Sequence, residues 1–245
     1  MIVLGLDLET TGLDTGTDRP IELAYVLWDT DEHKAVAMEN YLLFDDSYPT
    51  ISEEITKLTG IKTIELEKYS VKPQVALSHL LGFVSRHNPS YIVAHNGEMF
   101  DKPLLLAELH RQGFQNSSLQ TLPWVDTRTD LPFMDTPDSM KLKHLACDMG
   151  FINPFPHRAL SDVLTMLKVM SQFDFSEIEK LRAIPWITVR AVVDFDNKEK
   201  AKARRYSWEK IGEEVFPKQW VKRIKENKYE EEKTALSPFQ VVRIR

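Results

Sequence analysis

The chain begins with an apolar stretch, residues 2–8, that is interrupted by Asp7 and followed by a second acid two positions further on, Glu9. Alternate residues of a strand point to the same face, so this pattern predicts a strand with both carboxylates on one face. Two buried carboxylates repel each other and lose their hydration, and a divalent cation between them would offset both effects. The alternative is a strand that ends in a polar Thr-Thr-Gly turn, with both acids already solvated.

The following patterns predict strands first and then an alternation of strands and helices. Apolar runs and two-residue alternation predict strands at residues 21–28, 35–44, 91–94 and 124–126. Helical spacing of apolar residues predicts helices at residues 51–58, 74–86, 101–112, 139–149 and 157–170. This order is typical of an α/β layer architecture.

The last part of the chain differs from the rest in charge. The whole chain carries a net charge of -6, which by itself argues against a nucleic-acid partner, but residues 1–172 carry -10 and residues 173–245 carry +4. We therefore expect a domain at 1–172, a helical connector at 173–185 and a small basic α+β module at 186–245. The elements predicted after residue 172 are a helix at 173–184, a strand at 187–195, a basic helix at 197–205 and a strand at 239–244.

Composition excludes several classes of protein. The single cysteine, Cys147, excludes an internal disulfide and a cysteine-rich zinc site. The start of the chain is too short and too soon acidic for a signal peptide, and no apolar run approaches the ~18 residues of a membrane span. We expect a soluble cytoplasmic protein with no membrane partner.

Three more side chains lie at the ends of predicted elements. Asp101 opens a helix directly after a short strand and a polar turn, and the alternative for it is a simple helix N-terminal cap. His157 and Asp162 are five residues apart, so on one helix they would point in different directions. If His157 instead lies in the loop or the first turn, both can reach the same site.

These residues form a specific ordered pattern. Asp7-x-Glu9-Thr-Thr-Gly12 is followed by His95-Asn96-x-x-x-Phe100-Asp101 and then by His157-x-x-x-x-Asp162. Over residues 1–172 this pattern resembles the DnaQ-like 3′–5′ exonucleases of the branch with four acids and a histidine, the DEDDh type. The extra C-terminal region suggests a phage or bacterial member. One departure is that Asn96 and Asp101 are five residues apart, where the commonest proofreading-subunit form has four.

The resemblance implies a fold, a reaction and a set of ligands. The fold would be a ribonuclease-H-like mixed five-stranded sheet flanked by helices, with the acids at one edge. The reaction would be the release of nucleoside 5′-monophosphates from nucleic-acid 3′ ends, with DNA preferred over RNA and a polymerase or repair protein as a possible partner. Two ions, Mg²⁺ or Mn²⁺, would be held by carboxylate oxygens, the ligands that these cations prefer. The carboxylates are those of Asp7, Glu9, Asp101 and Asp162.

The resemblance also implies roles for other residues. His157 would be the general base that takes a proton from the attacking water, with His95 as its rival. Leu13 would pack on the terminal base, and Thr10 and Thr11 would place backbone amides on the terminal nucleotide. The other expected substrate contacts are Gly12 and Asn96, and Asn96 would orient either the substrate or the second motif. Two alternatives remain: an exoribonuclease of the same superfamily, or a non-catalytic protein that binds nucleic acid or a replisome.

Aromatic side chains among basic ones mark the C-terminal module. Basic residues could hold a phosphate backbone while Trp208 and Trp220 stack on nucleobases. The alternative is that both tryptophans form the core that so small a module needs, while the charges make a solvated face. The pattern Ala201-Lys202-x-x-x-Tyr206-x-Trp208, with a later Lys218-x-Trp220, is similar to accessory modules of phage and bacterial nucleases.

Overall fold

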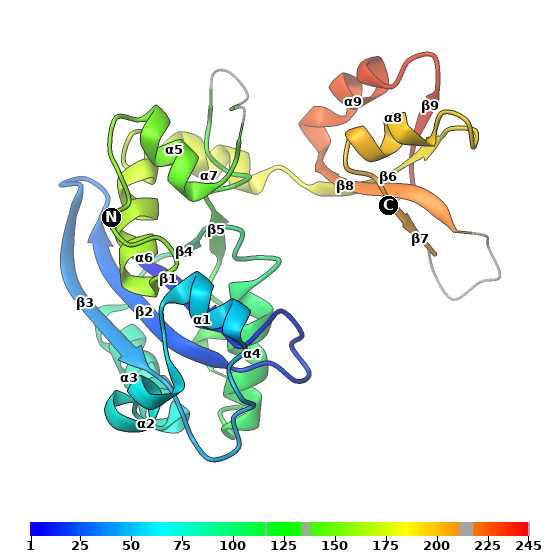
Figure 1. Cartoon of the computed structure of the whole chain (residues 1–245). Coiled ribbons are helices and arrows are strands. Elements are labelled where there is room, and N and C mark those ends of the chain that lie inside the picture. The colour runs from blue at the N-terminus through cyan, green and yellow to red at the C-terminus, as the bar shows by residue number, and fades with distance from the viewer. Residues whose placement is uncertain (116, 134–136, 138, 211–217, 245) are drawn as a thin grey trace. The chain divides into compact units, whose positions relative to one another are not determined.

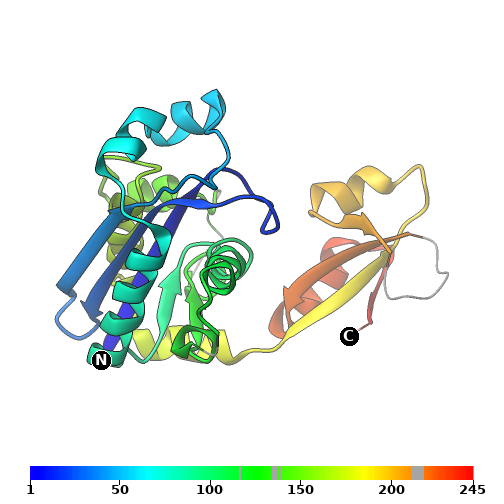
Figure 2. The same cartoon turned by 90° about the horizontal axis from the view of Figure 1, so that it is seen from below.

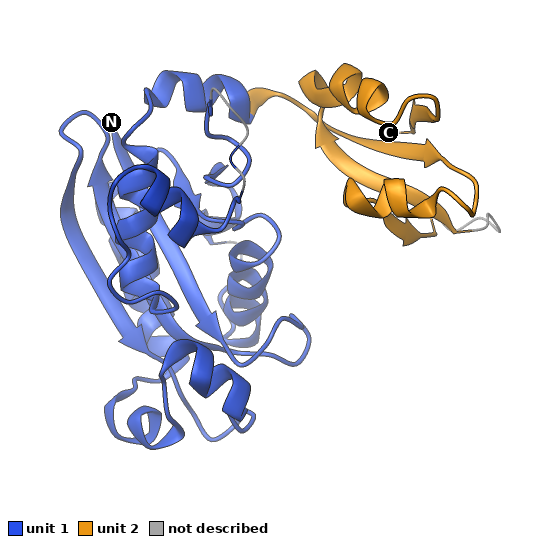
Figure 3. Cartoon of the chain, turned by 45° about the horizontal axis from the view of Figure 1, so that its top comes forward, with its two compact units in different colours: residues 1–182 blue, residues 183–245 orange. Residues whose placement is uncertain are grey.

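The computed structural model of the chain describes residues 1–115, 117–133, 137, 139–210 and 218–244 (Figure 1). The chain divides into two compact units, Met1–Arg182 and Ala183–Arg245, and each is described by itself (Figure 3). The first unit extends beyond residue 172, because helix α7 (Phe175–Ala183) buries Ile178 completely in its core. The Tyr91 hydroxyl also donates a hydrogen bond of 2.6 Å to Glu179 on this helix.

A five-stranded mixed sheet is the centre of the first unit, in the order β3-β2-β1-β4-β5. The first three strands pair antiparallel as a meander, and β4 and β5 add to β1 in parallel, which leaves β1 in the middle (Figures 1 and 2). The ribonuclease-H-like sheet expected from the sequence is thus confirmed. The strands are β1 (Ile2–Thr10), β2 (Pro20–Asp29), β3 (Lys34–Leu42), β4 (Ile92–Ala94) and β5 (Trp124–Asp126).

The alternation along β1 assigns its side chains to two cores. Leu4, Leu6 and Leu8 pack on the face covered by α3 and α4. Val3 packs on the opposite face with residues of α5, α6 and α7. Asp7 and Glu9 have the same parity as Val3, so they point to the face that carries α6. The helices are α1 (Glu53–Thr59), α2 (Thr63–Tyr69), α3 (Pro73–His87), α4 (Asp101–Arg111), α5 (Leu142–Asp148) and α6 (Ala159–Met170), with the short 3₁₀ turn η1 (Ser118–Gln120).

The second unit is a four-stranded antiparallel sheet in the order β7-β8-β6-β9, with helices on one face. Its core is aliphatic, with Ile187 and Val189 of the central strand packed on Ala201 and Leu236 of the helical segments. The predicted strand, basic helix and last strand are present. The pattern did not predict β7, β8 or α9. The elements are β6 (Trp186–Val192), α8 (Lys198–Ala203), β7 (Ser207–Glu209), β8 (Gln219–Lys225), η2 (Glu226–Lys228), α9 (Tyr229–Ala235) and β9 (Gln240–Arg243).

The two tryptophans of this unit differ in their surroundings. Trp220 is partly buried and packs against the core, as the structural alternative expected. Trp208 is half exposed and its ring lies 5.0 Å from that of Trp220, so it is not a core residue. Within the described parts of the chain, no helix has the length and apolarity that a membrane crossing requires.

Candidate active site

The position of α6 over β1 depends on a glycine. A methyl group at Gly5 would lie 2.7 Å from Leu167 Cδ1 and 2.8 Å from Val163 Cγ1, closer than real side-chain carbons approach. Only glycine therefore lets α6 pack this closely on the strand. Because Val163 follows Asp162, this contact brings the first turn of α6 beside the carboxyl end of β1.

Glu9, His157 and Asp162 come together at this place. Each offers one ligand atom, and these three atoms all lie within 4.8 Å of one another. His157 precedes α6, which begins at Ala159, so the predicted helix at 157–170 starts two residues later than expected. Its φ of 64° is in the left-handed region, which is uncommon for a residue other than glycine, and such backbone conformations concentrate at functional sites. The loop position is the one that allows His157 and Asp162 to share a site.

Asp162 is held by a loop residue that the sequence did not single out. Asn153 is almost completely buried and its side-chain amide donates to Asp162 Oδ1. Ser161 Oγ donates in turn to Asn153 Oδ1 at 2.6 Å, and the His157 backbone N–H donates to Asp162 Oδ2 at 3.0 Å. The Asp162 carboxylate is thus fixed in orientation from both of its oxygens. Nothing local in the sequence marks Asn153, because its role depends on how the loop folds back.

Asp101 is joined directly to the central strand. It is the first residue of α4, only 1% exposed, and its Oδ1 accepts the Leu8 backbone N–H at 3.0 Å. Its Oδ2 is buried and has no hydrogen-bond partner among the described residues. A buried oxygen without a partner is costly, which is more than a simple helix cap explains. Asp101 therefore lies beside Asp7 with one oxygen left over for a ligand.

The four acids Asp7, Glu9, Asp101 and Asp162 lie close enough together that each disfavours the ionised form of the others. Burial, and then the nearby carboxylates of Asp101, Glu9 and Asp162, raise the pKa of Asp7 well above its usual range. Burial and the charge of Asp162 raise the pKa of Glu9 to about 8, and burial raises that of Asp101 to about 7. The pKa of Asp162 is raised too, again chiefly by burial. In the absence of cations this cluster would hold protons near neutral pH.

A fifth acid, Glu22, has a different role. It pairs with Glu9 across the β1–β2 ladder and is fully buried. Its carboxylate accepts from the Arg158 guanidinium at 2.8 and 3.1 Å and from the Ala159 backbone N–H at 3.0 Å. Glu22 therefore holds the start of α6 and the residue after His157. The only sequence signal for it is an acid inside an otherwise apolar strand.

His95 does not belong to the cluster of Glu9, His157 and Asp162. Its ring is bound on both sides, with Nδ1 2.9 Å from Thr127 Oγ1 and Nε2 donating to the Met140 carbonyl at 2.9 Å. Burial lowers its pKa to about 4. His95 therefore acts as a neutral structural link, and His157 is the histidine that lies beside the acids.

The polar residues expected to contact substrate form hydrogen bonds with other residues of the protein. The Thr11 backbone N–H donates to the Arg19 carbonyl and its hydroxyl donates to Asp18, while the Thr10 hydroxyl donates to the Gly12 carbonyl. A side chain at Gly12 would collide with Asp18. These contacts shape the turn after β1 and leave Thr11 no open amide.

The other two expected substrate residues also differ from each other. Asn96 accepts from Arg128 Nη1 at 2.9 Å and donates its backbone N–H to Asp126 at 2.8 Å, so it organises the second motif. Leu13 is 78% exposed, which fits its expected contact with a base.

A second buried ion pair ties the turn after β1 to α4. The Arg19 guanidinium donates to both oxygens of Glu108 at 2.7 and 2.8 Å, and Glu108 is completely buried. The Arg19 guanidinium also stacks over the Tyr48 ring at 4.4 Å. This bidentate pair fixes the loop that carries Leu13 against the helix that carries Asp101. No spacing in the sequence links two residues so far apart along the chain.

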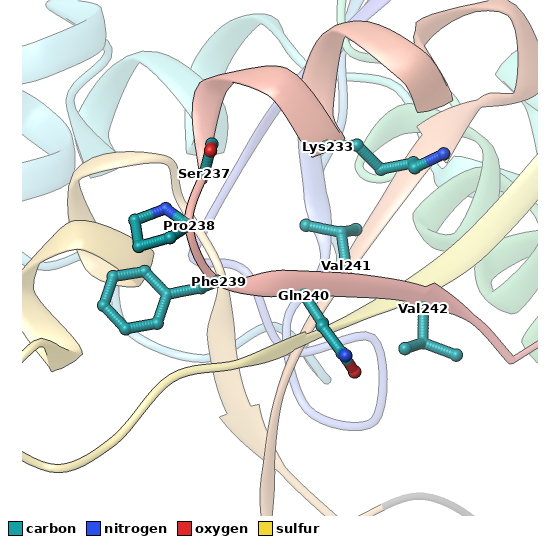
Figure 4. A pocket seen from close by; sticks show the side chains of 7 residues that line it. All are labelled: Lys233, Ser237, Pro238, Phe239, Gln240, Val241 and Val242. Atoms are coloured by element: carbon teal, nitrogen blue, oxygen red, sulfur yellow. The ribbon is translucent and has the colours of Figure 1, made fainter.

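Two surface pockets lie on other elements. One of about 660 Å³ in the first unit is lined by residues 44–47 and by Glu67, Ser70 and Lys72. The other, of about 280 Å³, lies where α9 leads into β9, and its single charged residue, Lys233, is already paired with Glu230 (Figure 4). Neither pocket includes any of the acids described above.

Comparison with known proteins agrees with this geometry. A family model described as exonuclease, of the RNase T type, matches residues 4–170, most of the chain. The chain belongs to the DnaQ-like exonuclease family. A solved DEDDh exonuclease, the nuclease domain of 3′hExo bound to rAMP, is 16% identical with a TM-score of 0.59, over 70% of this chain and 90% of that one.

Exonuclease I is also similar to this exonuclease-family chain. One exonuclease I structure is 16% identical with a TM-score of 0.63, over 77% of this chain but only 48% of that one. The zinc-bound E. coli exonuclease I complex with single-stranded DNA is 15% identical with a TM-score of 0.66, over 93% of this chain and 63% of that one. At these identities the similarity establishes the fold alone. A search of curated proteins found no match.

Proposed function

We propose that the protein is a metal-dependent 3′–5′ exonuclease that releases nucleoside 5′-monophosphates, most readily from DNA. The observation that supports this most strongly is the approach of Glu9, His157 and Asp162 to within 4.8 Å. Asp7 and Asp101 lie next to this group, because Asp101 is bound to the backbone of Leu8. The four acids and the histidine thus come from three distant parts of the chain.

The donor set fits two Mg²⁺ or Mn²⁺ ions. All four acids offer hard carboxylate oxygens, and the buried Asp101 Oδ2 has no partner among the described residues. The raised pKa values of Asp7, Glu9 and Asp101 indicate that the folded protein lacks positive charge here. Bound divalent ions would supply it, activate the attacking water and stabilise charge on the phosphate and leaving oxygen.

His157 would take the proton from the attacking water. Its ring is exposed, so it can pass the proton on to solvent, and its backbone is held by Asp162. Imidazole is the side chain best suited to exchange protons near neutral pH. Glu22 and Arg158 would keep His157 in place by anchoring the start of α6, without touching the substrate.

DNA is the proposed substrate, although relatives with both kinds of substrate are similar in fold. An exonuclease I complex with a dT13 oligonucleotide covers 91% of this chain, and a 3′-exonuclease that recognises a histone mRNA stem-loop covers 70%. We further propose that the protein acts at 3′ ends, that it works in the cytoplasm, and that its partner is a polymerase or a repair protein. An exoribonuclease remains the second candidate.

The test is hydrolysis of matched single-stranded DNA and RNA labelled at the 5′ end, with Mg²⁺, Mn²⁺ or EDTA. We expect stepwise shortening from the 3′ end, release of 5′-mononucleotides and no reaction in EDTA. Asp7→Ala should abolish turnover. Activity that persists in EDTA or in this variant would overturn the proposal, and equal or faster RNA turnover would overturn the preference for DNA.

A further inference from the structure

In the part of the second unit that the structure describes, all helices lie on one face of the sheet. In β6, Ile187, Val189 and Ala191 point into the core with α8 and α9. Both helical segments lie on that side, because Arg204, directly after α8, donates to Glu232 of α9 at 2.8 and 2.9 Å. Trp186, Thr188, Arg190 and Val192 alternate with the core residues, so they point to the opposite face.

Neighbouring strands extend this face. Across the β6–β8 ladder, Trp186 pairs with Lys225, Thr188 with Arg223 and Arg190 with Val221. In β9, Figure 4 shows Gln240 and Val242 on the side opposite to Val241, which points toward α9. We call the set of strand residues that point away from the helices the open face. Its members are Trp186, Thr188, Arg190, Val192, Ser207, Glu209, Gln219, Val221, Arg223, Lys225, Gln240 and Val242.

Positive charge is available on the open face. Among the described strand residues, its accessible cations are Arg190, which is partly buried, and Arg223, which is exposed, and its single acid is Glu209, at the end of β7. On the helix side several cations are paired with acids: Lys222 and Arg204 bind Glu232, and Lys233 binds Glu230. Among the described residues, neither Arg190 nor Arg223 has a carboxylate partner. Arg190 also has a buried Nε with no hydrogen-bond partner in the described chain.

An aromatic ring lies among these cations. The Arg223 guanidinium is 5.2 Å from the centroid of the Trp186 ring, and Lys225 Nζ is 5.0 Å from it. Trp186 is only partly buried, so part of the indole is accessible. Proteins that bind single-stranded nucleic acid place cationic side chains along its phosphate backbone and stack aromatic rings on its bases.

We infer that the open face of the second unit binds single-stranded nucleic acid, with Arg190 and Arg223 at phosphates and Trp186 stacked on a base. The charges of the two units favour this partner. Residues 1–182 carry a net charge of -11, whereas residues 183–245 carry +5. Because phosphate contacts supply most of the affinity for a polyanion, a strongly acidic catalytic unit needs a basic surface elsewhere in the chain.

The test measures binding by the full chain in EDTA, so that it does not require hydrolysis. We compare R190Q/R223Q with K228Q/K233Q, which removes the same charge from the helix side, where both lysines are paired with glutamates. For an oligothymidylate of about 20 nucleotides, we expect R190Q/R223Q to bind roughly tenfold more weakly, and its salt slope to fall by about 1.4. The control pair should change affinity by less than about twofold.

Trp186→Ala tests the stacking separately. It should weaken binding of the single strand by roughly tenfold and that of a duplex much less, because duplex bases are not free to stack. Unfolding curves for each variant establish that the second unit is still folded.

Several results would overturn the inference. They are unchanged affinity in R190Q/R223Q, an equal loss in the helix-side control, or equally tight binding of polyglutamate, which would indicate an acidic protein as partner. Hydrolysis of a mononucleotide ester, too small to span both sites, should stay normal in all three variants. If the wild type binds DNA but hydrolyses nothing, the nuclease proposal fails while this inference stands.

Discussion

Two sets of buried acids in the first unit have opposite surroundings. Glu108 is completely buried, yet its pKa is lowered, because hydrogen bonds and charge from Arg19, Gln112 and Arg111 outweigh the effect of burial. Asp7, Glu9 and Asp101 are buried without such partners, and their pKa values are raised. Among the described residues no arginine is hydrogen-bonded to these three acids, and at Glu9 burial and the neighbouring carboxylates outweigh the charge of Arg158.

The comparison separates a structural from a functional use of buried charge. A buried carboxylate that accepts two hydrogen bonds from one guanidinium has its charge and its hydrogen-bonding capacity satisfied, so it needs no ligand. A group of carboxylates without internal cations is destabilising until an external cation binds. Glu22 is the ladder partner of Glu9 but belongs with Glu108, because Arg158 and the Ala159 N–H satisfy it.

The largest effect should come from Asp7→Asn. Removing one carboxylate from the acid cluster should lower kcat on single-stranded DNA by at least about 10³-fold, since metal-ion stabilisation of the transition state is worth several kcal/mol. At high pH, where the cluster loses its protons, the metal-free variant should unfold at the same temperature as the wild type or higher, because one carboxylate that can carry a repelling charge is gone. Thermal unfolding and turnover measured on one preparation check both; a variant that is inactive only because it is unfolded would contradict the comparison.

Glu108→Gln should show the reverse pattern. The Arg19 guanidinium would remain buried without its carboxylate, which should lower the free energy of unfolding by about 3–5 kcal/mol. Activity per folded molecule should fall much less than in Asp7→Asn. Chemical denaturation measures the loss, and Glu53→Gln is the control, because its exposed pair with Lys57 should be worth less than about 1 kcal/mol. If Glu108→Gln lowers the free energy of unfolding by no more than the control does, Glu108 does not have the structural role described above.

The variant His157→Asn tests the role of His157 as the general base. Asparagine tolerates the positive φ of this position, so the loop should keep its shape while the proton acceptor is lost. We expect kcat to fall by about 10²-fold or more, which is typical of a missing general base, with little change in KM. Added imidazole should restore part of the rate. His144→Gln, an exposed histidine on α5, is the matched control. Full activity in His157→Asn would assign the proton to another group.

The sequence predicted what depends on local spacing. Two-residue alternation placed Asp7 and Glu9 on one face of β1, and the structure bears this out, because Val3 and Gly5 of the same parity face α6. It left open whether His157 lies in the helix or the loop, since a backbone with positive φ has no composition signal in a non-glycine residue. The resemblance supplied the order of the motifs that spacing alone could not interpret.

The contacts that could not be predicted from the sequence join segments that are far apart along the chain. Glu22 with Arg158, and Arg19 with Glu108, are far apart along the chain, and no periodicity joins them. Thr11 and Asn96 bond to their own loops, as turn residues of this kind often do, and their contact with substrate stays a prediction. In the second unit, β8 was missed because its Gln-Trp-Val-Lys-Arg-Ile-Lys sequence has no regular alternation.

The smallest expected effect is the pH dependence of stability without metal. Groups whose pKa is raised on folding stabilise the folded state fully below their unfolded pKa of about 4, and this contribution is lost as the pH rises through the folded pKa. For Asp101 and Glu9 the folded values are about 7 and about 8. The metal-free protein should therefore become less stable between about pH 5 and 8.5, where the cluster loses its protons.

Divalent ions should reverse this loss. Mg²⁺ or Mn²⁺ should raise the unfolding temperature of the first unit by several degrees at about pH 8, and by much less at about pH 5, where protons already neutralise the acids. Asp7→Asn should remove most of the metal effect, whereas Glu108→Gln should keep it, because the Arg19 pair takes no part in binding cations. An equal response to metal in both variants would mean that the two sets of buried acids do not differ in the way their surroundings indicate.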